Sequence, residues 1–222
     1  MTGADLVAES GREVQELLDL GFGRCRLALA VPESSEIRHP ADIPAGSRIA
    51  TSFPAITRSF FDALGVQIEI APVSGATEIA PHLGVADVIV DLVSTGSTLR
   101  VNRLREVATI LESTARVVAN PEVLVDPERK PTIEELVTAL ESVLRARARR
   151  YLMANVPKAR LEEVRAVLPG INGPTIVEVA DDGAWVAAHA VVDADRVYQT
   201  IARLKALGAE GILVTRIERL MP

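Results

Sequence analysis

Hydrophobic and polar positions alternate over the first 120 residues in short units that predict strands and helices in turn. Residues 4–20 have the spacing of an amphipathic helix, and the glycines that follow it precede an apolar run at 25–31 that predicts a strand. Further strands are predicted at 48–50, 66–71, 85–93, 107–111 and 116–119, with helices at 58–64 and near 78–83. This alternation is typical of an α/β fold.

A connection punctuated by prolines leads into the clearest helix of the sequence, at residues 132–150. Thr132 and Glu135 have the spacing of a capping box. The helix carries one apolar stripe that must pack against another element, made of Ile133, Leu136, Val137, Leu140, Val143 and Leu144. Four arginines lie near the end of this helix: Arg145, Arg147, Arg149 and Arg150. The favoured interpretation is that they are solvated side chains that compensate the helix dipole, and the alternative is that they form an anion site.

The last 70 residues predict a separate small domain. Strands are expected at 151–156, 175–179, 185–192 and 211–216, with helices at 158–168 and 194–207. The sequence Asp181-Asp182-Gly183 predicts a turn between the two central strands. The resulting order βαββαβ is that of a ferredoxin-like domain.

Composition narrows the functional classes. Hydrophobic residues make up 48% of the 222 residues, which argues against disorder, and aromatic residues make up only 3%, so the core must be aliphatic. The net charge of −6 argues against a nucleic-acid surface but leaves room for a small anionic ligand. Cys25 is the single cysteine, and His39, His82 and His189 have no partners at metal-ligand spacing. No apolar run is long enough for a membrane span, so we expect a cytoplasmic protein.

The strongest chemical signal follows the predicted strand at 85–93. The strand ends at Asp91, and the loop after it carries Thr95, Gly96, Ser97 and Thr98. Backbone N–H groups and hydroxyls in such a turn bind phosphate oxygens, a glycine admits the ligand close to the backbone, and an acid at a strand's carboxyl end can accept hydrogen bonds from sugar hydroxyls. The pattern therefore indicates a ribose phosphate site, although a hydroxyl-rich loop with a helix N-cap is the alternative.

Taken whole, residues 78–99 resemble the signature of the ATP phosphoribosyltransferases. The resemblance extends along the chain through residues 2–6, 18–23, 48–54, 151–155, 174–175, 204–209 and 212–214. Type I phosphoribosyltransferases place two adjacent acids before a similar loop, but here Val90 stands in the first position, which indicates convergence on another architecture. The resemblance implies a two-lobed catalytic part like that of periplasmic binding proteins, followed by a ferredoxin-like regulatory domain that senses histidine.

The family reaction uses Mg²⁺ as a cofactor and joins ATP to phosphoribosyl pyrophosphate. It commits ATP to histidine biosynthesis and is inhibited by L-histidine. The resemblance implies Asp91 and Glu78 as catalytic acids, and Asp91 with Thr95, Gly96, Ser97, Thr98 and Leu99 as the phosphoribosyl pyrophosphate site. It implies Asp5, Leu6 and Phe53 for ATP, and Asn155, Ile171, Thr175, Val191 and Gly211 for histidine. Glu78 has an alternative role as a first-turn helix acid, and Phe53, Ile171, Thr175 and Val191 have alternative structural roles. The metal ligands are not indicated, and a homo-oligomer is expected.

The family also has a leading segment with a Pro-Lys-Gly motif that has no counterpart before residue 1 here. We therefore expect residues 1–27 and 120–150 to form an incomplete first catalytic domain, residues 28–119 a second catalytic domain, and residues 151–222 the regulatory domain. Three hypotheses remain open: an enzyme, an inactive ligand-binding or regulatory paralogue, and a truncated fragment. We expect the 222-residue chain to have little activity by itself.

Overall fold

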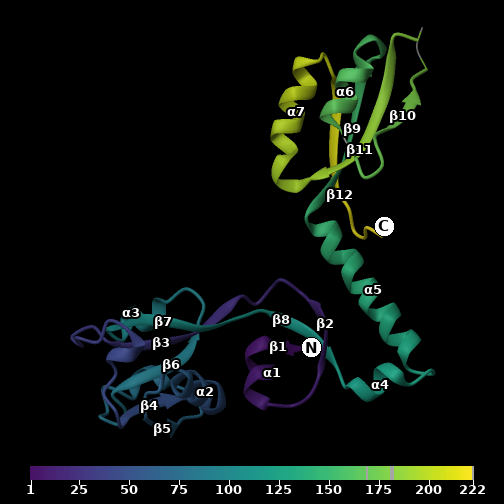
Figure 1. Cartoon of the computed structure of the whole chain (residues 1–222). Helices are drawn as coiled ribbons and strands as arrows, with labels where there is room; N and C mark the ends of the chain where they lie inside the picture. Colours follow the sequence, from purple (N-terminus) through teal and green to yellow (C-terminus); the bar gives the residue numbers. More distant parts are fainter. Residues whose placement is uncertain (169, 181–182, 222) are drawn as a thin grey trace. The chain divides into compact units, whose positions relative to one another are not determined.

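The protein folds into two compact units, Met1–Lys130 and Pro131–Pro222 (Figure 1). The structure is a computed structural model that describes residues 1–168, 170–180 and 183–221. None of its described helices combines the length and the apolar character needed to cross a membrane. The assignment of residues 1–27 and 120–150 to one catalytic domain stays a prediction.

A five-stranded mixed sheet forms the larger part of the first unit. Its strands, in spatial order, are β5 (Ile68–Pro72), β4 (Ser47–Thr51), β6 (Val88–Val93), β3 (Cys25–Pro32) and β7 (Leu104–Ser113). Strand β4 is parallel to both of its neighbours, whereas β3 is antiparallel to β6 and β7. Alternate residues of β3 point to opposite faces, so Leu27 and Leu29 pack with Phe61 on one side while Ala28 and Ala30 join a second cluster on the other. Both faces are therefore buried, as the apolar runs predict.

The connections of this sheet differ in part from the prediction. Helix α2 (Pro54–Leu64) begins four residues before the predicted start at 58, with Pro54 in its first turn, and ends at Gly65, where φ is 69°. The helix expected near 78–83 is wrong, because only the 3₁₀ turn η2 (Thr77–Ile79) forms there. Pro81 follows the turn closely, and proline does not fit inside a helix. Two short elements complete the connections, the 3₁₀ turn η1 (Pro40–Asp42) and helix α3 (Ser97–Val101).

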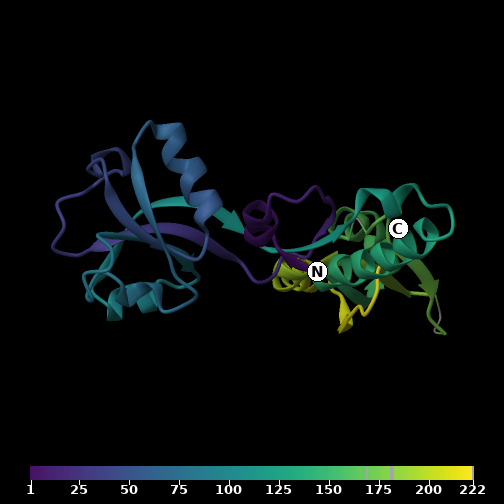
Figure 2. The same cartoon turned by 90° about the horizontal axis from the view of Figure 1, so that it is seen from below.

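A smaller lobe contains β1 (Thr2–Gly3), α1 (Ala4–Ser10), β2 (Gln15–Asp19) and β8 (Ala115–Ala119), with the antiparallel order β1-β8-β2. The single helix predicted for residues 4–20 is wrong: it ends at Gly11, where φ is 58°, and the second half is a strand. Pairing with β8 satisfies the strand's backbone, and the sequence pattern of one segment cannot reveal such a partner. Two chain segments join the lobes, one between β2 and β3 and one between β7 and β8, which fits the expected two-lobed architecture (Figure 2).

The second unit contains the predicted ferredoxin-like domain. Its elements are β9 (Arg149–Pro157), η3 (Lys158–Arg160), α6 (Leu161–Val167), β10 (Thr175–Glu178), β11 (Trp185–Asp193), η4 (Ala194–Arg196), α7 (Val197–Ala206) and β12 (Glu210–Arg216). The strand order is β10-β11-β9-β12 with every described pair antiparallel. Leu152, Val156 and Ala188 face the helices with Val164 and Leu204, so α6 and α7 cover one face of the sheet. The predicted turn at Asp181 and Asp182 lies outside the described residues.

Helices α4 (Pro121–Val125) and α5 (Lys130–Arg147) precede this domain. Because α5 begins at Lys130, Thr132 lies inside its first turn, and the predicted capping box is wrong. The buried residues of α5 are Ser142 and Ala146 rather than members of the predicted apolar stripe, and Leu136 of that stripe is 55% exposed. The sequence predicted the helix and its stripe, but the stripe is at most half-buried in the described chain.

Candidate active site

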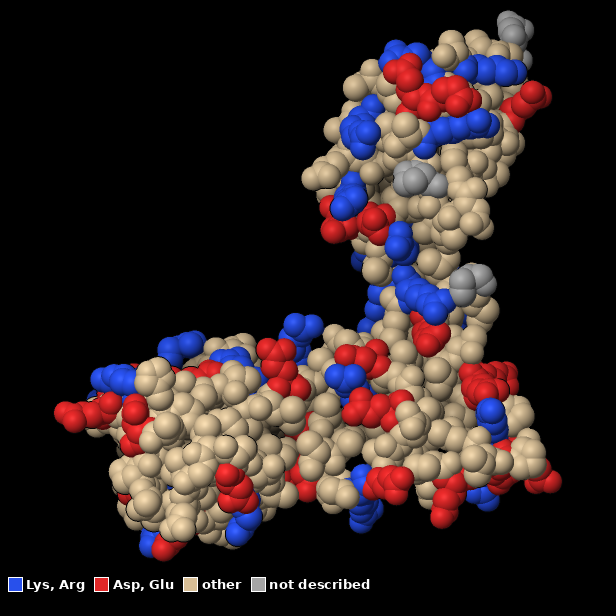
Figure 3. Space-filling view, viewed as in Figure 1, with Lys and Arg blue, Asp and Glu red and all other residues tan. Residues whose placement is uncertain are grey.

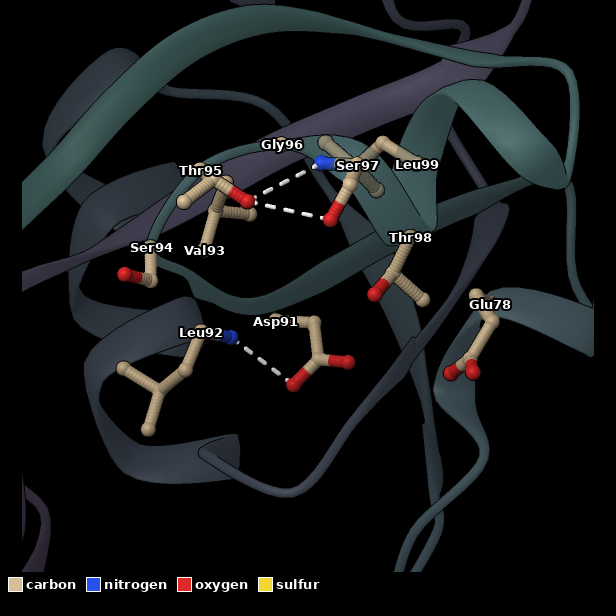
Figure 4. Close-up of a pocket in the computed structure, with 10 residues that line it drawn as sticks. All are labelled: Glu78, Asp91, Leu92, Val93, Ser94, Thr95, Gly96, Ser97, Thr98 and Leu99. Atoms are coloured by element: carbon tan, nitrogen blue, oxygen red, sulfur yellow. Dashed lines mark hydrogen bonds between the residues drawn. The ribbon is translucent and has the colours of Figure 1, made fainter.

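A pocket of about 270 Å³ opens at the carboxyl end of β6, where open α/β sheets bind ligands (Figure 4). Ten residues line it: Glu78, Asp91, Leu92, Val93, Ser94, Thr95, Gly96, Ser97, Thr98 and Leu99. Nine of these form one continuous segment that leaves β6, turns and enters α3. The predicted phosphoribosyl pyrophosphate residues therefore lie together around a single cavity.

Asp91 is the acid closest to the end of β6. Its carboxylate accepts a hydrogen bond from the backbone N–H of Leu92 at 2.8 Å. Burial raises the pKa of Asp91, and the negative charge of Glu78 raises it further, although hydrogen bonds from Leu92 and Thr77 act in the opposite direction. The site therefore holds a carboxyl group whose charged form is poorly solvated until a ligand supplies partners.

Glu78 reaches the same pocket from η2. The turn begins at Ala76, which has the left-handed φ of 52° that residues with a Cβ adopt only rarely, and Thr77 beside it is 1% exposed. Burial of Thr77 fixes the turn, so Glu78 faces Asp91 and Thr98 across the pocket (Figure 4). Two carboxylates from separate segments are thereby directed at one cavity.

The loop beside these acids is shaped by Gly96, which has a φ of 74°. Thr95 Oγ1 lies 3.0 Å from Ser97 Oγ and 3.4 Å from the backbone nitrogen of Ser97, which donates to it. A Cβ added to Gly96 would lie 3.5 Å from Nη1 of Arg100 and 4.0 Å from Nη2 of Arg26. The loop thus exposes hydroxyls and backbone toward the pocket, with two guanidinium groups near the glycine.

Arg26 and Glu106 hold the loop, and sequence reasoning missed both. Arg26 Nη1 donates to the carbonyl oxygen of Ser94 at 3.1 Å, while its Nε and Nη2 bind the Glu106 carboxylate at 2.6–3.1 Å. The same arginine lowers the pKa of Glu106. The available signal was the charged Arg26 within the otherwise apolar strand β3, but its partner is 80 residues away in the sequence.

Comparison with known proteins identifies the family. Residues 1–142 match the family model described as ATP phosphoribosyltransferase, and residues 146–219 match the model described as the HisG C-terminal domain. The chain belongs to the ATP phosphoribosyltransferase family. This agrees with the resemblance carried by residues 78–99. Glu78 at the start of this segment and residues 91–99 at its end line the pocket.

Relatives and a solved structure support the same assignment. The ATP phosphoribosyltransferase of Gemmatimonas aurantiaca is 60% identical over 228 residues, which cover 100% of this chain and 78% of the relative. That of Methanopyrus kandleri is 51% identical over 222 residues, covering 100% and 77%. The ATP phosphoribosyl transferase (HisG:HisZ) complex from Thermotoga maritima matches with a TM-score of 0.57 and 29% identity, over 64% of this chain and 68% of that chain.

The residues that the ATP phosphoribosyltransferase resemblance implies for ATP are Asp5 and Leu6 on α1, which contacts α2 and β7 of the larger lobe, and Phe53 immediately before α2. Asp5 is buried, and its carboxylate accepts a hydrogen bond from Ser113 Oγ. Leu6 is 53% exposed, whereas Phe53 is buried in the core. Glu9 joins α1 to α2, because its carboxylate accepts hydrogen bonds at 2.9 and 3.0 Å from two backbone N–H groups at the start of α2. Leu6 is therefore the accessible member of the predicted set.

The residues implied for histidine spread over the face of the second sheet that α6 and α7 do not cover, and over a neighbouring loop. Asn155 and Gly211 are neighbours, because a Cβ added to Gly211 would lie 3.4 Å from Asn155 Nδ2. Asn155 pairs with Ala187 on β11, four residues before Val191. At roughly 3.3 Å per residue, Asn155 and Val191 are about 13 Å apart along the sheet. The two ends of the set are therefore separated within one chain.

The remaining two positions are Thr175 on β10 and Ile171 in the loop after α6. Thr175 pairs with His189, whose Nδ1 is 3.0 Å from the hydroxyl of Tyr151. Ile171 lies in the loop after α6 and is 57% exposed. The structure thus brings Asn155 to Gly211 and places Thr175 on the edge strand β10 of the same sheet, but it does not gather all five positions in one place.

Proposed function

We propose that this chain is an ATP phosphoribosyltransferase that catalyses the first step of L-histidine biosynthesis. In this reaction N1 of the adenine of ATP displaces pyrophosphate from C1 of phosphoribosyl pyrophosphate and forms phosphoribosyl-ATP. The observation that carries the proposal is the pocket in which Asp91 and Glu78 face the loop from Thr95 to Leu99. Family membership supports the same conclusion over both units.

The loop would hold the 5-phosphate of the substrate. Hydroxyls of Thr95, Ser97 and Thr98 line the pocket together with the backbone at Gly96, and these groups suit the oxygens of a phosphate. Leu99 is buried and anchors the first turn of α3 beneath the loop. A phosphate here would place the ribose toward the carboxylates.

The two acids would serve the ribose and its reacting carbon. Asp91 in its charged form would accept hydrogen bonds from ribose hydroxyls, which would replace the water it loses by burial. As the bond from C1 to pyrophosphate breaks, positive charge develops on the ring, and the carboxylates of Asp91 and Glu78 would stabilise it. The Arg26 and Glu106 pair would keep the loop in place during this step.

A Mg²⁺ ion fits this donor set as a companion of the substrate. Among the described residues no group of three or more His, Cys, Asp or Glu side chains could hold a metal by itself. Mg²⁺ is commonly bound by one or two carboxylates together with substrate phosphates, and Asp91 and Glu78 offer such carboxylates. When bound, the ion would neutralise charge on the departing pyrophosphate.

For ATP we retain Asp5, Leu6 and Phe53 as the proposed contact region. The exposure of Leu6 supports an apolar contact with the purine, whereas Asp5 and Phe53 would act from buried positions unless the lobes move. Glu9 occupies the N–H groups at the start of α2, where an anionic group of a ligand would otherwise be favoured. Binding of ATP here would therefore compete with Glu9.

We further propose that the second unit responds to L-histidine through Asn155, Ile171, Thr175, Val191 and Gly211, and that the protein is a homo-oligomer. Support comes from the match to the HisG C-terminal domain and from the contact between Asn155 and Gly211. The separation of Asn155 from Val191 is compatible with a histidine site shared by two chains. Calorimetric titration with histidine, together with light scattering to determine the oligomer, tests this part; absence of histidine binding in the assembled protein would contradict it.

The central test is calorimetric titration of the 222-residue chain with phosphoribosyl pyrophosphate and Mg²⁺, paired with an assay of phosphoribosyl-ATP formation. Asp91→Asn should weaken substrate binding or turnover by about 100-fold, because it removes a charge aimed at the developing positive centre. Asp87→Asn is the matched control, since the Asp87 carboxylate accepts from the backbone of Arg48 instead of lining the pocket. Unchanged binding and turnover in Asp91→Asn would refute the assignment.

A further inference from the structure

A second pocket, of about 290 Å³, lies entirely within the second unit. It opens between the end of α6, the start of β9, the end of β11 and one side of α7. The polar side chains that line it are Arg149, Asp193, Arg196, Gln199, Thr200 and Arg203. Only Val191 of the proposed histidine residues touches this pocket, so it is a separate site from Asn155 and Gly211.

The charges of this pocket are unbalanced. Its one carboxylate, Asp193, forms an ion pair with Arg149 at 2.7 Å. Arg196 and Arg203 form no ion pair within the described part of the chain. Elsewhere in the same unit, Arg160 and Arg165 are each paired with a glutamate. Three guanidinium groups against one carboxylate leave the pocket with two uncompensated positive charges.

Helix α7 arranges its donors along one side. Arg196 immediately precedes the helix, and Gln199, Thr200 and Arg203 follow at intervals that place them on the same face. Thr200 is 9% exposed, which fixes the floor of the pocket, whereas both arginines are exposed at its rim. The space-filling view shows basic side chains over the region of α7 (Figure 3). The pocket therefore combines exposed cations with a buried hydroxyl and the positive end of the helix dipole.

Among the arginines at the end of α5, the structure separates two roles that sequence leaves open. Arg145 pairs with Glu141, and Arg150 donates to the carbonyl oxygens of Arg147 and Arg149, so these two have local structural partners. Arg149 instead projects its charge to the second pocket, where Asp193 holds it. Of these three arginines, only Arg149 therefore lines the second pocket.

We infer that this pocket binds the phosphate group of a small molecule. Guanidinium groups present planar donor pairs that match phosphate oxygens, and several donors from different elements converge here on one cavity. The amide of Gln199 and the hydroxyl of Thr200 supply further hydrogen bonds to the same oxygens. The second unit then carries an anion site in addition to the proposed histidine site.

The test uses the full ¹⁵N-labelled chain, titrated with inorganic phosphate and followed by amide NMR at constant ionic strength. Saturable shifts should appear at Gln199, Thr200 and Arg203, because these residues line the pocket. They should persist whether or not the loop at Thr95 also responds, and residue-specific signals keep the two sites apart. Shifts confined to that loop, or equal shifts with chloride, would overturn the inference.

Variants supply the control. The double variant Arg196→Ala and Arg203→Ala should weaken phosphate binding at least about tenfold, since it removes both uncompensated charges. Lys205→Ala removes one positive charge from the same helix but outside the pocket lining, so its effect should stay within about twofold. Both arginines are exposed, and loss of folding is therefore not expected. Equal losses in the two variants would show that only general charge matters and would contradict a site.

Ribose 5-phosphate distinguishes the two sources of the phosphate group. Tighter binding of ribose 5-phosphate than of inorganic phosphate at Gln199 and Arg203 assigns the pocket to a phosphate ester. Equal or weaker binding assigns it to free phosphate. In either case the arginine double variant must lose the signal, and retention of full affinity in that variant would overturn the proposal.

Discussion

The two pockets of this protein have nearly the same volume, about 270 and 290 Å³, but they are built in opposite ways. The first is a continuous turn of small residues and hydroxyls after β6, faced by two carboxylates. The second is assembled from arginines on β9 and around α7, with a single carboxylate. A site built from backbone and hydroxyls leaves a contiguous mark in the sequence, whereas a site built from long side chains on separate elements does not.

The largest effect should follow from removing the backbone conformation of the first pocket. Gly96→Val places a β-branched residue at a φ of 74° and directs its side chain toward Arg100, so binding of phosphoribosyl pyrophosphate should fall by about 100-fold or more. Calorimetric titration measures the loss. Gly208→Val is the matched control, because Gly208 has a φ of 84° and similar space beside Pro157 but lies in the other unit. Comparable losses in both variants would mean that general destabilisation, and not the loop, is responsible.

The second effect is a pH dependence of the first pocket. Because the pKa of Asp91 is raised above its ordinary value of 3.8, the folded protein binds this proton more tightly than the unfolded chain. The contribution of Asp91 to the free energy of unfolding is therefore fully present at pH values below its ordinary pKa, and it is lost as the pH rises through the raised pKa of the folded protein.

Substrate binding should depend on pH in the opposite sense. Binding that needs charged Asp91 should strengthen with rising pH, by at most about tenfold per pH unit within the same window. Calorimetry in two buffers with different ionisation enthalpies should detect proton release on binding at weakly acidic pH, and Asp91→Asn should abolish it. Proton release of the same size in that variant would show that another group titrates.

A smaller effect should follow from loosening the support of the first pocket. Glu106→Gln removes the charge that holds Arg26, and because both side chains are about one-third exposed or less, it should cost about 1 kcal/mol and weaken substrate affinity about fivefold. The KM for phosphoribosyl pyrophosphate should rise more than kcat falls. Glu69→Gln is the control, since Glu69 pairs with Arg48 at 3.8 Å in an exposed position away from the loop. A change confined to kcat would contradict a positioning role.

The smallest effect concerns the second pocket and has the opposite sign. Asp193→Asn removes its one carboxylate and leaves Arg149 unpaired, so phosphate affinity should rise, by about threefold at moderate salt. The NMR titration of Gln199 and Arg203 measures this gain. Added salt should reduce this gain in phosphate affinity more than the same salt concentration reduces ligand affinity at the loop after β6. A loss of affinity in Asp193→Asn would mean that the ion pair shapes the pocket rather than opposing the ligand.

The sequence by itself determined the family, the βαββαβ order of the second unit and the phosphate loop at Thr95 to Leu99. These features depend on residues close in the chain: apolar periodicity builds the strands, and one turn supplies the hydroxyls and the glycine. Asp91 and the loop therefore appeared together in the sequence as they do in the structure.

Only the tertiary structure decided features that depend on distant partners. Residues 15–19 have helical spacing but form β2, because β8 provides a pairing partner about 100 residues later. For the same reason, the sequence did not predict the hydrogen bonds from Arg26 to Glu106. It also did not predict the position of Arg149, whose partner Asp193 and neighbour Arg203 lie on other elements. Local pattern fixes which face of a segment is apolar, but which charged side chains meet is decided by long-range packing, where no single segment carries the information.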